Sequence, residues 1–137
     1  MERDDLRHQV SWLDLFGWTE DDLNGLRFVA YSYIQQRHYE IALKIFEALV
    51  VLSPSSSYDL QTLGALYLEI GDNLKALTYL DRALVYEPEH GVTLLNQAKA
   101  LILLGYYKQG LRQMAVLKGH SDAIISRQAE ALLMAYQ

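Results

Sequence analysis

The stretch SYDLQTLGALYLEIGDNLKALTYLDRALVYEPEH, residues 57–90, decides the fold because its pattern recurs one length earlier and one length later. Pro54 and Pro88 mark this period, which is about 34 residues. The same offset aligns residues of similar size throughout: Leu26 with Leu60, Ala30 with Gly64, Tyr33 with Tyr67, Ala42 with Ala76, Phe46 with Leu80 and Leu49 with Ala83. A repeat of this length predicts stacked supersecondary units that bury one continuous core.

The small residues of the repeat indicate where two antiparallel helices approach closely. Ala30 or Gly64 on the first helix of a pair would face Ala42 or Ala76 on the second, with large residues filling the space around the contact. A third copy continues in register with Leu94, Ala98, Leu101, Gly110, Met114 and Leu117, but Asp122 stands where proline is expected. Gly110 costs roughly 1 kcal/mol of helix propensity relative to alanine but preserves the small volume at the crossing, and we interpret it as tolerated drift.

This period and helix-pair pattern identify the tetratricopeptide repeat (TPR) and predict an all-α fold. Apolar spacing predicts helices over about 22–35, 39–52, 57–70, 73–86, 91–104 and 107–118. Thr19 with Asp22, and Ser56 with Asp59, supply N-cap signals. We therefore expect residues 1–137 to form a single domain, a three-TPR helical solenoid. Its expected parts are an N-terminal amphipathic helix (about 4–17), repeats (about 23–56, 57–90 and 91–120) and a C-terminal capping helix (about 122–136).

The N-terminal segment carries apolar side chains that need a partner. Leu6, Val10 and Leu13 share one helical stripe, joined by Trp12, Leu15, Phe16 and Trp18. Covering the open end of the first repeat is one interpretation, because terminal repeats of solenoids need caps. The alternative is an interface with a second copy of the chain or with another small protein, made by Trp12, Leu13, Phe16 and Trp18.

Composition narrows the class of protein. Hydrophobic residues make up 51% of the 137 residues, charged residues 21%, and there is no cysteine. These values predict a folded protein without disulfides or thiolate metal sites. No apolar stretch approaches the ~20 residues of a membrane span, and the first residues do not resemble a secretory signal, so a cytoplasmic location is expected. The net charge of −5 and the lack of a basic stripe argue against nucleic acid as a partner.

Signals for catalysis, metal binding and cofactors are missing from the sequence. His8, His38, His90 and His120 are scattered without helical i, i+4 pairing. Phosphate-cradling glycine loops and the nucleophile-elbow motif do not occur. We predict a protein that is not an enzyme and has no metal and no cofactor.

The TPR resemblance implies that the first helix of each pair lines a concave groove. On that basis the predicted partner-binding residues are Arg27, Tyr31, Ile34, Tyr58, Gln61, Ala65, Leu68, Val92, Leu95, Lys99 and Ile102. Some of these residues, Leu68 and Ile102 among them, could instead belong to the core. A lysine-and-asparagine clamp for a terminal carboxylate is not assembled, since the corresponding positions hold Arg27, Tyr31, Thr62, Val92 and Asn96.

The segment FGWTEDDLNGLRFVAYSYIQQRHYEIALKIFEALVVLSP, Phe16 to Pro54, resembles the start of the class II type III secretion chaperones. The resemblance continues through three repeats to a closing helix that ends in AEALLMAYQ. It implies a chaperone that holds a segment of a secreted translocator in its groove and keeps the client soluble before export. The related chaperones of the needle subunit, which act with a co-chaperone, remain an alternative, as do a general TPR scaffold and a regulatory subunit of an enzyme.

Overall fold

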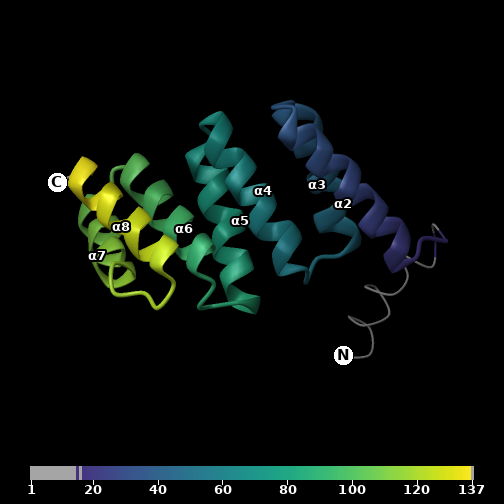
Figure 1. The fold of residues 1–137 in the computed structure, drawn as a ribbon. Coiled ribbons are helices and arrows are strands. Elements are labelled where there is room, and N and C mark those ends of the chain that lie inside the picture. Colours follow the sequence, from purple (N-terminus) through teal and green to yellow (C-terminus); the bar gives the residue numbers. More distant parts are fainter. Residues whose placement is uncertain (1–14, 16, 137) are drawn as a thin grey trace, which may run out of the picture.

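The computed structural model describes residue 15 and residues 17–136, and this part of the chain contains seven α-helices and no strand. The helices are α2 (Glu20–Gln35), α3 (Tyr39–Leu52), α4 (Ser57–Ile70), α5 (Asn73–Tyr86), α6 (Gly91–Leu103), α7 (Tyr107–Leu117) and α8 (Ala123–Tyr136) (Figure 1). The all-α class is confirmed, and the bounds of each repeat helix lie close to those expected. The helix expected over about 4–17 falls outside the described residues, apart from positions 15 and 17.

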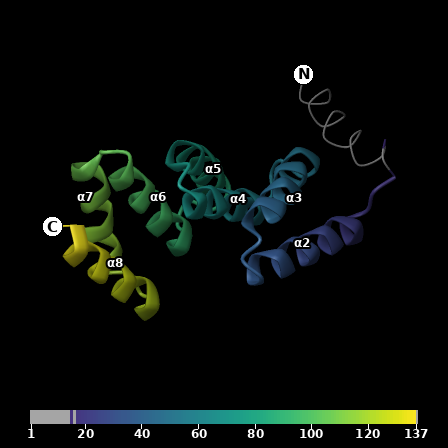
Figure 2. The same ribbon diagram turned by 90° about the horizontal axis from the view of Figure 1, so that it is seen from above.

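The helices pack as pairs of neighbours along the chain: α2 with α3, α4 with α5, and α6 with α7, followed by α8 (Figure 1). Seen from above, they follow an arc in which α2 and α8 lie at the two ends of the inner side, with α4 and α6 between them (Figure 2). The odd-numbered helices lie on the outer side. This arrangement leaves the first helix of each pair facing a concave surface.

The turn inside each helix pair uses one backbone conformation three times. Arg37, Gly71 and Gly105 have φ values of 62°, 90° and 96°, and they occupy the same position in successive repeats. In each turn the amide of the following residue donates to a carbonyl in the last turn of the preceding helix, at 2.8–2.9 Å. Such left-handed helix ends favour glycine, so the first pair makes the turn at a steric cost that the other two avoid.

Glycine is required where the paired helices cross. A Cβ on Gly64 would lie 2.7 Å from Leu80 Cγ, and a Cβ on Gly110 would lie 2.5 Å from Ile102 Cγ1 and 2.9 Å from the carbonyl oxygen of Ala98. The small volume expected at position 110 is confirmed, but glycine is a requirement of this crossing and not tolerated drift. Backbone atoms of α6 and α7 approach so closely that position 110 has no room for a methyl group.

The N-cap signals are partly confirmed. Thr19 and Asp22 form a full capping box at the start of α2. Ser56 caps α4 by accepting from the amide of Asp59 at 3.2 Å, but the carboxylate of Asp59 points elsewhere, to Arg27. Asp122, which replaces the proline of the repeat, accepts from the amide of Ile124 at 2.9 Å at the start of α8.

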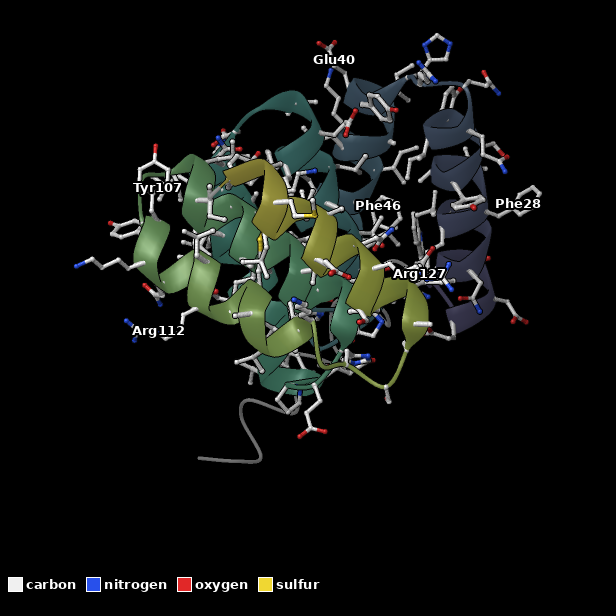
Figure 3. All side chains as sticks on the ribbon, turned by 60° about the vertical axis from the view of Figure 1, so that its left-hand side comes forward. Phe28, Glu40, Phe46, Tyr107, Arg112 and Arg127 are labelled. Atoms are coloured by element: carbon white, nitrogen blue, oxygen red, sulfur yellow. The ribbon has the colours of Figure 1, made fainter. Side chains whose placement is uncertain are left out.

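The core is continuous through the first two pairs and divided beyond them. Leu23, Phe46, Leu60 and Leu80 are fully buried in one cluster that runs from α2 to α5 and reaches Ala100 of α6. Figure 3 shows Phe46 directed into the helices, whereas Phe28 projects outward from α2. The α6, α7 and α8 helices hold two smaller clusters, one of which includes Leu95. The C-terminal end therefore depends on fewer buried side chains.

Candidate functional site

A groove of about 540 Å³ opens on the inner side of the arc between α2, α4 and α6. Its wall residues come from those helices, from the first residue of α3 and from the N-cap of α6: Tyr31, Ile34, Tyr39, Tyr58, Gln61, Thr62, Ala65, Leu66, Glu69, His90, Val92, Thr93 and Asn96. The volume is in the range of pockets that bury a substantial part of a ligand. It is therefore the candidate functional site.

The groove presents apolar side chains to solvent. Tyr31 is 50% exposed, Tyr58 45% and Val92 49%, one from each of the three lining helices. The ring of Tyr58 lies 6.3 Å from the buried ring of Phe46, which supports it from below. Exposed apolar side chains gathered in a concavity are typical of contact sites. Aromatic side chains held by the core are well suited to bind the anchor residues of a protein segment.

An ion pair joins α2 to α4 beside the groove. Nε and Nη2 of Arg27 each donate at 2.7 Å to a different carboxylate oxygen of Asp59, which is fully buried. Nη1 donates to Glu20 at 3.0 Å and to Asn24 at 2.8 Å. Hydrogen bonding to Asp59 is the main cause that raises the pKa of Arg27 above its ordinary value. The guanidinium is thus committed to the fold and is poorly placed to bind a carboxylate of a partner.

A hydrogen-bonded chain joins α4 to the start of α6 inside the groove. The hydroxyl of Thr93, which is 2% exposed, lies 2.8 Å from Gln61 Oε1 and 2.8 Å from His90 Nδ1. This hydrogen-bonded set of three side chains was not predicted from the sequence. The repeat contained the signal, because Gln61 and Thr93 occupy the positions of Arg27 and Asp59 one repeat later.

The structure brings six of the predicted partner-binding residues together in the groove: Tyr31, Ile34, Tyr58, Gln61, Ala65 and Val92. Arg27 lies in an adjoining polar depression, Leu68 packs against the core, and Lys99 is half-buried on α6. None of these three lines the groove. Whether the six residues bind a partner stays a prediction.

Leu95 and Ile102 do not lie on a surface, so the expectation that they face the groove is wrong, and the alternative that Ile102 belongs to the core is confirmed. Leu95 is 6% exposed and packs in a cluster with Leu117, Ile125 and Ala129. Ile102 is 2% exposed and packs with Ala98 and Met114. The positional rule of the repeat placed them in the groove, but here α7 and α8 cover them.

Several groove residues were not predicted from the sequence because they belong to helix ends or to positions that the rule omits. Tyr39 is the first residue of α3 and His90 is the cap of α6, so neither lies inside a first helix. Leu66 and Thr93 line the groove although both are buried.

The proposed dimer or co-chaperone residues are mostly beyond what the structure shows. Trp12, Leu13 and Phe16 lie outside the described residues, and Trp18 is 37% exposed. The role of this group stays a prediction. Within residues 17–136, no helix is long and apolar enough to cross a membrane, and no cluster of three or more metal-ligating side chains occurs.

The fold matches known structures of TPR proteins. A type III secretion complex from Aeromonas hydrophila matches with a TM-score of 0.82 and 18% identity, covering 99% of this chain and 95% of that one. The type III secretion chaperone SycD of Yersinia enterocolitica, in complex with a peptide of the translocator YopD, matches with a TM-score of 0.78 and 22% identity over 86% and 94% of the two chains. The first TPR domain of Spaghetti (RPAP3), bound to an HSP90 peptide, matches at 0.75 and 12% identity over 86% and 92%.

These likenesses confirm the TPR-like helical solenoid. No protein-family model matches the chain, and no curated protein matches it by sequence. At such low identity the structural similarity establishes the fold.

Proposed function

We propose that this chain is a type III secretion chaperone that holds a segment of an export client, a translocator, in the groove of α2, α4 and α6. The observation that carries the proposal is the exposed apolar lining of Tyr31, Tyr58 and Val92 in a concavity. The likeness of the fold to SycD with its bound YopD peptide supports it. The role needs no chemistry: the groove covers an aggregation-prone segment until export, in the bacterial cytoplasm, and the protein is not an enzyme.

A clamp for a terminal carboxylate is the less favoured mode of binding. The Spaghetti domain binds an HSP90 peptide on the same fold. Here Arg27 is held by Asp59, and Tyr31 and Val92 occupy other positions expected to carry clamp residues. The groove therefore favours apolar anchors within a client segment over its charged end.

Site-specific crosslinking tests the proposal and captures the client in one step. A photoreactive phenylalanine at Tyr58 probes the groove, and the same residue at Val85, which is 75% exposed on α5, serves as the matched control. We expect a secreted protein of the export system to crosslink from position 58 in the source cells. Crosslinking to it from position 85 alone would place the client on the outer side and contradict the proposal.

Solubility on co-expression gives the functional measurement. Tyr31→Ala and Tyr58→Ala should each weaken client binding by about 2 kcal/mol, because truncating a central aromatic anchor removes contacts made only in the complex. The client should then move to the insoluble fraction while helix content stays unchanged. Lys44→Ala is the control, since Lys44 is exposed on α3. Lys75 and Arg82 are less suitable controls because they lie over the rings of Tyr67 and Tyr79.

The same experiments separate the alternatives. A needle subunit crosslinked at position 58, together with a small co-chaperone, would identify a needle chaperone. A partner that is soluble without this chain would identify a TPR scaffold.

A further inference from the structure

Only one end of the Gln61 carboxamide is hydrogen-bonded within the described part of the protein. Its Oε1 faces the buried hydroxyl of Thr93 at 2.8 Å. Within the described residues, its Nε2 has no acceptor on the protein. One end of the carboxamide is thus hydrogen-bonded within the fold, and the residue as a whole lines the groove.

The Thr93 hydroxyl has a single proton, which limits how Gln61, Thr93 and His90 can be hydrogen-bonded to one another. If the hydroxyl donates to Gln61 Oε1, it must accept from His90, and Nδ1 of His90 carries a proton. If the hydroxyl donates to His90 Nδ1 instead, Gln61 must turn over and present its carbonyl to the groove. The two arrangements offer a partner opposite hydrogen-bonding groups.

The carboxamide of Gln61 is oriented as in the first arrangement. Oε1 can only accept, and it lies 2.8 Å from the Thr93 hydroxyl, so the hydroxyl proton is directed to Gln61. The hydroxyl oxygen is then the acceptor in its 2.8 Å contact with His90 Nδ1. Only the second arrangement lets Nδ1 also accept from the amide of Thr93, which is the N-cap contact of α6 at 3.4 Å. The presence or absence of a proton on Nδ1 therefore distinguishes the two arrangements.

We propose that Gln61 is the hydrogen-bond donor of the groove, held by Thr93 and His90 so that its NH2 group binds a carbonyl oxygen of the client segment. This inference rests on the proposed function. Apolar groove residues bind side chains of the client and do not fix the position of its backbone. A hydrogen-bond donor held in place among apolar residues would fix the position of one client carbonyl, and with it the register of the bound segment. Thr93 and His90 are positioning residues that do not need to touch the client.

Nuclear magnetic resonance on the free protein tests the arrangement without a partner. The ¹⁵N shifts of the His90 ring should show a proton on Nδ1. The side-chain NH2 resonances of Gln61 should shift in Thr93→Val and return in Thr93→Ser, which restores the hydroxyl. A His90 ring with an unprotonated Nδ1 would overturn the proposal, because Gln61 would then present its carbonyl.

A double-mutant cycle tests the role in binding, with the YopD peptide as one probe and a synthetic peptide of the segment crosslinked at position 58 as the other. Gln61→Met should weaken binding about 3- to 10-fold, the range of one hydrogen bond. Thr93→Val should weaken it in the wild-type background and not in the Gln61→Met background, since the hydroxyl acts through Gln61. Thr78→Val on α5 is the control, because that hydroxyl donates to the carbonyl of Leu74.

The outcomes distinguish the two proposals. Loss of binding in Tyr58→Ala with no change in Gln61→Met would overturn the donor role and leave the chaperone proposal standing. Additive effects of Gln61→Met and Thr93→Val would show that Thr93 acts independently and would also overturn it. If the wild-type protein binds neither peptide, the chaperone proposal fails, and the His90 and Gln61 resonances alone decide the arrangement.

Discussion

The junction between α2 and α4 and the junction between α4 and α6 use the same two repeat positions with different chemistry. Arg27 and Asp59 form a buried ion pair in the first, whereas Gln61 and Thr93 form a neutral hydrogen bond in the second. The next residue in this register is Leu95, which packs against Ile125 of α8. The same repeat position thus makes an ionic contact in the first repeat, a neutral hydrogen bond in the second and an apolar contact in the third.

The difference matters for binding because each contact leaves a different surface. The ion pair and its neighbours engage every nitrogen of the Arg27 guanidinium, so this side chain has little left to offer a partner. The neutral contact leaves half of the Gln61 carboxamide available. The apolar contact removes Leu95 from the surface altogether. The repeat determines which backbone positions face the next helix. The residues of that next helix then determine which side chains stay accessible to a client.

Removing one half of the ion pair should give the largest effect. Arg27→Met leaves the carboxylate of Asp59 buried without its counterion, and the free energy of unfolding should fall by about 3–5 kcal/mol. The double variant Arg27→Gln with Asp59→Thr copies the second junction into the first and buries no charge. It should lose less than about 2 kcal/mol. Urea unfolding followed by circular dichroism measures both, and equal losses would show that the two junctions are not interchangeable.

Truncation at the apolar junction should come next. Leu95→Ala should reduce stability by about 2–4 kcal/mol because it leaves a cavity between α6 and α8. Amide hydrogen exchange should increase in α8 more than in α3, since repeat arrays can open from one end. Leu103→Ala, at a 45% exposed position of α6, is the control. Equal exchange in both helices would indicate that the chain opens as one unit.

A smaller loss is expected at the crossing of α6 and α7. Gly110→Ala should destabilise by about 1–3 kcal/mol, because the added methyl group meets the carbonyl of Ala98 and cannot be accommodated by side-chain rotation. Gly25→Ala, in α2 with open space around it, should instead stabilise by up to about 1 kcal/mol. Thermal unfolding of the two variants gives the comparison. A stabilised Gly110→Ala variant would mean that the crossing is looser than described.

The smallest effect is expected at the turn of the first helix pair. Arg37→Gly should raise stability by at most about 1 kcal/mol, because glycine removes the left-handed strain but adds freedom to the unfolded chain. The converse change, Gly71→Arg, should lower the melting temperature. A lower melting temperature for Arg37→Gly would show that the arginine side chain stabilises this turn.

The sequence alone determined the helices and their pairing. These depend on apolar spacing, caps and small residues at crossings, all of which recur with the period of the repeat. It also identified Tyr31, Tyr58 and Val92 as groove residues, because the direction of their side chains follows from the position of each residue on its helix. The N-cap signal at Thr19 and Asp22 is equally local.

Only the tertiary structure decided the burial and the contacts of Arg27, Gln61 and Leu95, which share one repeat position. Each has a different neighbour on a helix farther along the chain: Asp59 on α4, Thr93 on α6 and Ile125 on α8. Burial and hydrogen bonding depend on what the next helix brings to that position, and a repeat pattern does not contain that information. At position 110 the repeat predicts a small residue, and the close approach of the α6 backbone decides that this residue is glycine.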